Sequence, residues 1–153
     1  MQMYKKILVP LDGSELSECS LLHVKALVKE SSIGDVIVLS VVGTAIPRDG
    51  MDNGIDFNAS RQKLISTSQE YLAGVASRLS AEGIKVKTEL IEAYDPSSVI
   101  TDYAQKNDID LIIITTHGHT GKQERYFGSV TENVLRESYI PILVIRPKRP
   151  LKN

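Results

Sequence analysis

Short apolar runs typical of buried strands alternate along this chain with stretches in which apolar residues recur every three or four positions. Residues 7–9, 36–42 and 111–114 are runs of Ile, Leu and Val interrupted by one serine. Continuous runs indicate strands buried on both faces, whereas the longer period indicates amphipathic helices. Strands that alternate with helices pair in parallel through right-handed crossovers. The pattern therefore predicts a three-layer α/β fold, an open sheet of five mainly parallel strands with helices on both faces.

Capping residues indicate where the helices that flank this predicted sheet begin and end. Ser14 is suited to cap the first helix, and Gly83 to end the second. Asp95 followed by Pro96 is typical of a third helix start, with the aspartate acting only as a cap. The apolar stripes predicted to face the core are Leu16, Cys19, Leu22, His23, Ala26 and Leu27 in the first helix, and Leu64, Ser68, Tyr71, Leu72, Val75 and Leu79 in the second.

The remaining segments complete the order of elements. Residues 84–90 alternate apolar and polar side chains, which predicts a strand near a sheet edge with one wet face. Residues 43–57 hold three glycines and a proline, and they are predicted to form a long surface loop. A last helix over residues 129–136 and a fifth strand over residues 142–145 follow.

Length and charge limit the classes of function. With 153 residues, 42% of them hydrophobic, residues 1–153 are expected to form a single domain. The net charge of -1 offers no general attraction for nucleic acid or anionic membrane. The apolar start is too short for a signal peptide, and no stretch approaches the roughly 20 apolar residues that cross a bilayer. We therefore expect a cytoplasmic protein with neither kind of partner, in which the lone Cys19 is a small buried residue and His23 is packed.

The segment after the fourth strand carries the residues best suited to phosphate. It comprises Thr115, Thr116, His117 and Gly118, then nine residues, then Gly128, Ser129, Val130 and Thr131. Glycine allows positive φ and lets a phosphate approach the backbone. A helix that starts at Ser129 offers free N–H groups and the positive end of its dipole, with two hydroxyls as further donors. We expect this segment to hold phosphates.

The spacing resembles the nucleotide loop of the universal stress protein family, written G-x2-G-x9-G-[ST], with Thr115 in place of the leading glycine. Residues 5–14 resemble the family's opening strand and turn, and residues 141–146 its closing strand. The resemblance implies ATP as ligand, with or without Mg²⁺, and a homodimer formed through the closing strand from Ile142 to Ile145. By this resemblance the nucleotide-binding residues are Pro10, Leu11 and Val41 beside adenine, Asp12 on the ribose, and Thr115, His117, Gly118, Gly128, Ser129, Val130 and Thr131 around the phosphates.

The resemblance implies a small nucleotide-responsive regulatory or chaperone-like module of the stress response. We expect at most slow ATP hydrolysis, because no general base is evident beside the γ-phosphate. Two alternatives stay open. One is a family member that binds no nucleotide and acts through dimerisation, since Thr115 restricts the backbone and adds a side chain to the pocket wall. The other is an adenylyl-transferring enzyme, for which residues 43–57 would have to make the second substrate site. A metal site at His117 and His119 lacks a matching carboxylate cluster.

Overall fold

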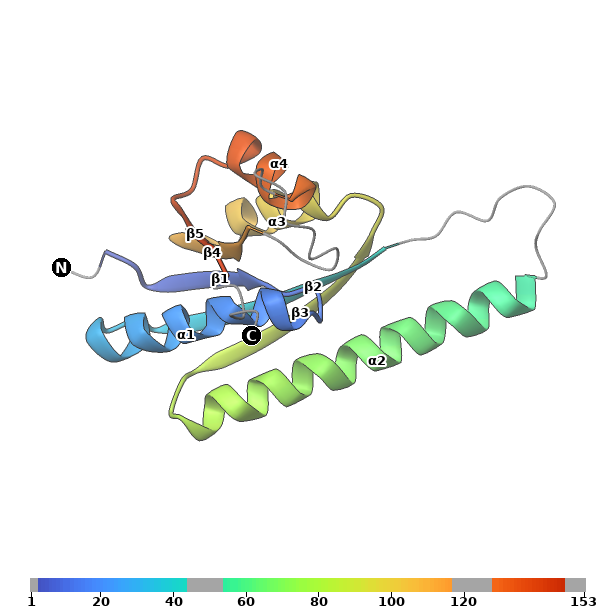
Figure 1. Ribbon diagram of the computed structural model, residues 1–153, viewed down its shortest axis with the longest axis horizontal. Helices are drawn as coiled ribbons and strands as arrows, with labels where there is room; N and C mark the ends of the chain where they lie inside the picture. Colours follow the sequence, from blue (N-terminus) through green and yellow to red (C-terminus); the bar gives the residue numbers. More distant parts are fainter. Residues whose placement is uncertain (1–2, 44–53, 117–127, 148–153) are drawn as a thin grey trace, which may run out of the picture.

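The computed structural model describes residues 3–43, 54–116 and 128–147, and it confirms the open parallel sheet with helices on both faces (Figure 1). Strands and helices alternate along the chain, as the sequence pattern predicts. The elements are β1 (Lys6–Pro10), α1 (Glu15–Glu30), β2 (Asp35–Gly43), α2 (Gly54–Ala81), β3 (Val86–Ala93), α3 (Pro96–Lys106), β4 (Leu111–Thr115), α4 (Ser129–Glu137) and β5 (Ile142–Ile145).

The strand order β3-β2-β1-β4-β5 reverses direction at β1. The chain adds β2 and β3 on one side of β1, and it adds β4 and β5 on the other. Ile7 accordingly pairs with Val36 of β2 and with Leu111 of β4. Because every pair is parallel, all carboxyl ends lie at one edge, and the helices that follow β1 and β4 diverge there to opposite faces. Such a reversal is where open α/β sheets bind ligands.

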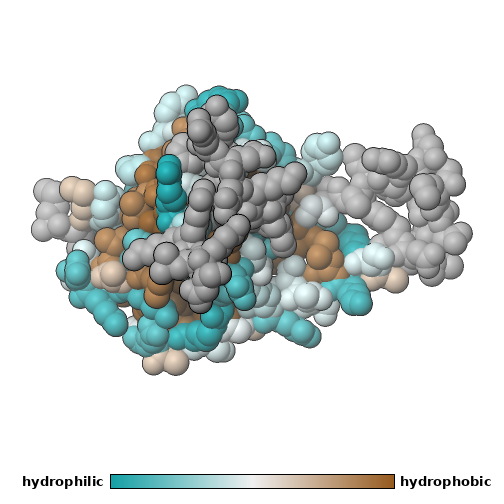
Figure 2. All heavy atoms as spheres, in the orientation of Figure 1, coloured by the Kyte–Doolittle hydropathy of each residue, from teal (hydrophilic) through white to brown (hydrophobic). Residues whose placement is uncertain are grey.

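Each face of the sheet has its own apolar core. Helices α1 and α2 cover one face, and α3 and α4 cover the other (Figure 1). Alternate residues of β1 serve the two cores, since Ile7 and Val9 pack beneath α1 and α2 whereas Leu8 packs beneath α3 and α4. In the space-filling view, hydrophobic residues gather in the middle of the molecule, with hydrophilic ones along its lower rim (Figure 2).

The predicted helix ends are confirmed. Ser14 caps α1 by accepting a hydrogen bond from the Ser17 N–H, and Asp95 caps α3 by accepting from the Ser97 N–H. Gly83 follows α2 with φ +81°, a left-handed conformation that favours glycine. Residues 84–90 coincide largely with β3, which lies at a sheet edge as expected.

The predicted buried face of α1 is wrong. Leu22 is 69% exposed, and both His23 and Ala26 are exposed, while Cys19 is only half-buried. Buried instead are Ser17, Ser20, Leu21 and Val24. The serines tolerate burial because each hydroxyl donates to a carbonyl one turn earlier, Ser17 to Ser14 at 2.9 Å and Ser20 to Ser17 at 2.8 Å. Small side chains also let the helix approach the sheet closely.

The predicted loop over residues 43–57 is too long at both ends. Gly43 is the last residue of β2, and α2 already begins at Gly54; residues 44–53 lie outside the described chain. No proline interrupts the sequence from Gly54 to Ala81, so the helix continues toward its N-terminus beyond the apolar stripe that predicted it. As a result, the first half of α2 projects past the end of the sheet (Figure 1).

Within residues 3–43, 54–116 and 128–147, no helix is both long enough and apolar enough to cross a bilayer.

Candidate functional site

A cavity of about 500 Å³ opens at the carboxyl ends of β1, β2 and β4. Its size lies within the roughly 300–1,000 Å³ of small-molecule sites, and its wall is mostly apolar with a few polar groups. The described residues that line it are Pro10, Leu11, Asp12, Ser17, Leu39, Val41, Val42, Gly43, Leu64, Ser68, Pro96, Ile100, Ile114, Thr115, Gly128, Ser129, Val130 and Thr131.

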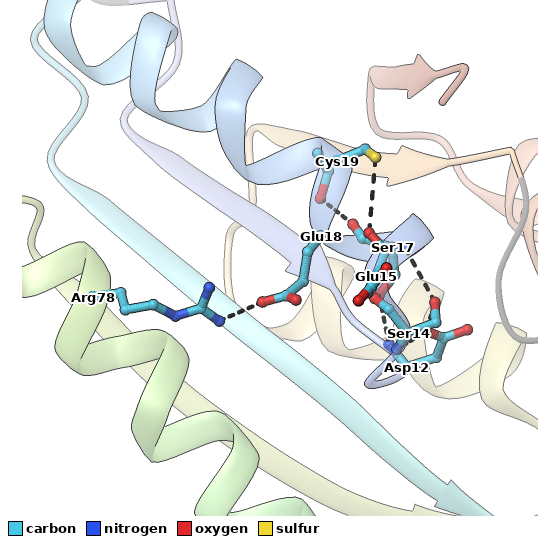
Figure 3. Close-up of polar contacts among 8 residues, drawn as sticks. Asp12, Ser14, Glu15, Ser17, Glu18, Cys19 and Arg78 are labelled. Carbon is cyan, nitrogen blue, oxygen red and sulfur yellow. Dashed lines mark hydrogen bonds and ion pairs between the residues drawn. The ribbon is translucent and has the colours of Figure 1, made fainter. Parts of the chain in front are cut away.

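The turn from β1 into α1 holds Asp12 at the edge of this cavity. The Asp12 Oδ1 accepts from the Ser14 N–H at 2.9 Å and from the Ser14 hydroxyl at 2.5 Å (Figure 3). The Ser14 Oγ in turn accepts from the Ser17 N–H at 3.1 Å. Gly13 between them has φ +87°, so the tight turn requires a residue without a Cβ. Asp12 is the one carboxylate among the described lining residues.

Two buried hydroxyls hold this turn, one from the sheet and one from α1. The Ser40 Oγ of β2 donates to the Leu11 carbonyl at 2.8 Å, and the Asp12 N–H donates to the Ser17 Oγ at 3.4 Å. The hydroxyl of Tyr71 in α2 is buried without a hydrogen-bond partner among the described residues. Burial, reinforced by the charge of Glu18, raises the pKa of Tyr71 to about 12. The nearby Ser17 hydroxyl weakly opposes this shift, although it lacks the geometry of a hydrogen bond to Tyr71. The tyrosine therefore stays neutral at physiological pH.

Helix α4 starts at the cavity without a side-chain cap. Its N-cap residue, Gly128, has no side chain to offer, whereas α1 and α3 have Ser14 and Asp95. The first N–H groups of a helix have no partner inside the helix. The N–H groups of Ser129 and Val130 thus begin α4 at the cavity wall, with the positive end of the helix dipole.

The conformation of Gly128 corrects one sequence-based expectation. Its φ of -60° and ψ of 155° are ordinary extended values, so the helix start does not need glycine for positive φ. What remains is the absence of a Cβ, which lets a ligand come close to the backbone. The Gly128 N–H is itself used, since it donates to the Thr116 carbonyl at 2.7 Å.

The sequence predicted that the Thr131 hydroxyl would be a free donor to phosphate, and this prediction is wrong. Thr131 is only 4% exposed, and its Oγ1 donates to the Thr115 carbonyl at 2.7 Å. This bond ties the first turn of α4 to the end of β4. Thr115 belongs to β4 and pairs with Ile145 of β5, so its backbone is extended, a conformation that β-branched residues favour.

The structure brings most of the sequence-predicted site residues together and adds others. Nine of the predicted residues line the cavity, while His117 and Gly118, like His119, lie outside the described chain. Sequence reasoning missed the other lining residues, which are Ser17, Leu39, Val42, Gly43, Leu64, Ser68, Pro96, Ile100 and Ile114. The polarity of Ser68 within its apolar stripe is not a sufficient signal, because Ser17 and Ser20 of α1 are equally polar and are buried.

Over the residues that the structure describes, no group of three His, Cys, Asp or Glu side chains could hold a metal ion; His117 and His119 lie outside these residues.

Comparison with known proteins gives the family. A model of the universal stress protein family matches residues 3–146. The chain belongs to this family. Universal stress protein MJ0577 of Methanocaldococcus jannaschii is 35% identical over 95% of this chain and 97% of its own length. Its solved structure superposes with a TM-score of 0.84 at 34% identity, covering 97% of this chain and 99% of that one. Universal stress protein MJ0531 of the same organism is 33% identical over 98% of this chain and 85% of its own length.

A more distant member of the universal stress protein family was solved with a nucleotide. The universal stress protein of Archaeoglobus fulgidus in complex with dAMP shares the fold, with a TM-score of 0.67 at 21% identity, covering 93% of this chain and 98% of that one. That protein therefore binds an adenine nucleotide on the same architecture.

Proposed function

We propose that this universal stress protein binds ATP in the cavity at the carboxyl ends of its strands. The observation that carries the proposal is the start of α4, which meets the cavity with Gly128 as its cap and no capping side chain. Backbone N–H groups and a helix dipole at such a place favour a phosphate group. The adenine nucleotide in the Archaeoglobus fulgidus relative adds support.

The lining residues suit the parts of the ligand. The N–H groups of Ser129 and Val130, with the Ser129 hydroxyl, would hold phosphates, and Gly118 would join them as the family spacing implies. Asp12 would accept hydrogen bonds from the ribose hydroxyls, since ionised carboxylates make the stronger hydrogen bonds. The adenine ring would lie against the apolar side chains of Pro10, Leu11 and Val41.

Bound ATP would serve chiefly as a signal. Asp12 is the one described carboxylate in the wall, and it already accepts from Ser14, so we assign no general base and expect hydrolysis to be slow at most. Mg²⁺ would accompany the ATP phosphates and reduce their charge. The protein would act in the cytoplasm as a nucleotide-responsive regulatory or chaperone-like module of the stress response, as a homodimer joined at β5.

Replacing Gly128 by valine tests the assignment. The backbone angles of Gly128 are open to valine, so Gly128→Val should fold while its branched side chain blocks the approach of phosphate. Titration calorimetry should then show ATP binding in the wild type and none in Gly128→Val. Gly74→Val is the matched control, because a Cβ at this exposed position in α2 meets no atom within 4 Å. Equal ATP affinity in the wild type and folded Gly128→Val would refute the assignment.

A further inference from the structure

The wall of the cavity includes two residues of α2 that the family's loop pattern does not contain. Leu64 and Ser68 both line it. They continue the stripe that buries Leu72, Val75 and Leu79 farther along α2, since positions four residues apart lie on one face of a helix. Where α2 passes the end of the sheet (Figure 1), this stripe meets the cavity instead of the core.

The hydroxyl of Ser68 is available for a ligand. Two other hydroxyls in the wall are already used, because Ser17 donates to the Ser14 carbonyl and Thr131 donates to the Thr115 carbonyl. Ser68 is half-buried and lines the cavity, and its hydroxyl makes no hydrogen bond within the described chain. A half-buried hydroxyl in an apolar stripe gains most when a ligand supplies the missing hydrogen bond.

The place of α2 decides which part of the ligand Ser68 would meet. Helix α2 packs on β2 and β3, whereas α4 follows β4 and packs on the opposite face of the sheet. In the strand order, β1 separates β2 from β4. Ser68 and the start of α4 thus border opposite ends of the cavity. If α4 holds phosphates, the α2 end receives the nucleoside.

An ion pair fixes this part of α2 to the sheet. One turn before Leu64, the Arg61 Nε and Nη2 donate to the two carboxylate oxygens of Glu92, each at 2.6 Å. Hydrogen bonding by Arg61 also lowers the pKa of Glu92 below its ordinary value, so Glu92 remains a carboxylate at physiological pH. The planar two-point pairing restrains the direction of the helix where α2 leaves the sheet.

We propose that Ser68 is a ligand-binding residue for the nucleoside half of the nucleotide. Its hydroxyl hydrogen-bonds the sugar or base, while Leu64 covers the nucleoside from the side of α2. This inference rests on the proposed function, because it assumes that the α4 end of the cavity takes the phosphates.

Titration calorimetry with adenosine, ATP and tripolyphosphate tests the two ends of the cavity separately. The Ser68→Ala variant should fold, because alanine has a higher helix propensity than serine. Its affinities for adenosine and for ATP should fall by the same factor, about three- to tenfold, while its affinity for tripolyphosphate stays unchanged. Ser77→Ala, at an exposed position on the opposite side of α2, is the matched control and should bind all three as the wild type does.

Each result decides between the two claims. Adenosine affinity unchanged in Ser68→Ala would overturn the role of Ser68 and leave the proposed function standing. A Ser68→Ala variant with weaker ATP binding but unchanged adenosine binding would place Ser68 at the phosphate end of the cavity, which also overturns the inference. A wild type that binds neither adenosine nor ATP would refute the proposed function itself, and this inference with it.

Discussion

At the scale of single residues, Asp12 and Thr115 carry most of the interpretation. Asp12 organises the turn into α1 through both bonds from Ser14 and also lines the cavity. Asp12 therefore has a structural role in this turn in addition to the role in ligand binding proposed for it. Thr115 departs from the family loop, yet it lies in β4 on an extended backbone, so the missing glycine causes no conformational conflict at this position.

Thr115→Gly measures how much this departure matters. Since the Thr115 backbone is already extended, the variant should change ATP affinity by less than about tenfold, or roughly 1.4 kcal/mol. It should also be less stable by about 0.5–1 kcal/mol, because glycine weakens a strand interior. Calorimetry gives the first value and urea unfolding the second. A wild type without ATP binding, together with a Thr115→Gly variant that binds, would establish the alternative in which this family member acts without nucleotide.

At the scale of elements, the clearest predictions came from unambiguous periods and caps. The apolar run before Thr115 specified β4, and Ser14 and Asp95 specified the starts of α1 and α3. The buried face of α1 was mispredicted because serines that bond to their own helix can be buried, while Leu22 remains exposed. Periodicity weighs side-chain polarity, and it does not register hydrogen bonds that remove the cost of burial.

Strand β5 has an open edge suited to a second copy of the chain. It pairs only with β4 in the described sheet, and Leu143 is 36% exposed. The Pro141 carbonyl accepts from the Ile112 N–H of β4 at 3.0 Å, and the Ile145 carbonyl accepts from the N–H of Thr116, just after β4, at 2.9 Å. Because successive residues direct their backbone groups to opposite sides, the N–H of Val144 faces the free edge. An unpaired edge of this kind invites antiparallel pairing about a two-fold axis.

Val144→Pro tests dimerisation at this edge. Proline removes the outward donor without breaking the ladder with β4, so the variant should remain folded and become monomeric. Val144→Ala keeps the N–H and should stay dimeric, which separates the backbone effect from loss of the side chain. Sedimentation at micromolar concentration reports the state of each. A monomeric wild type, or a dimeric Val144→Pro, would exclude β5 as the interface.

At the scale of the whole molecule, the strand order brings segments distant in the sequence to one cavity. The turn after β1, the end of β2 and the start of α4 meet there, and resemblance to the family predicted all three. The contribution of α2 was not predictable in the same way. The sequence pattern predicts Ser68 to face the core. In the structure α2 runs past the sheet, and Ser68 lines the cavity instead. Helix length and direction, rather than residue pattern, decide whether such a position meets core or ligand.

The central claim is that ATP binds at this cavity, and amide chemical shifts recorded while ATP is added to isotopically labelled protein test it most directly. The account predicts saturable shifts that cluster at Leu11, Asp12, Val41, Ser129 and Val130, with little change on the outer face of α1 around Leu22. Spectra that stay unchanged at millimolar ATP, or shifts confined to residues away from the cavity, would contradict it.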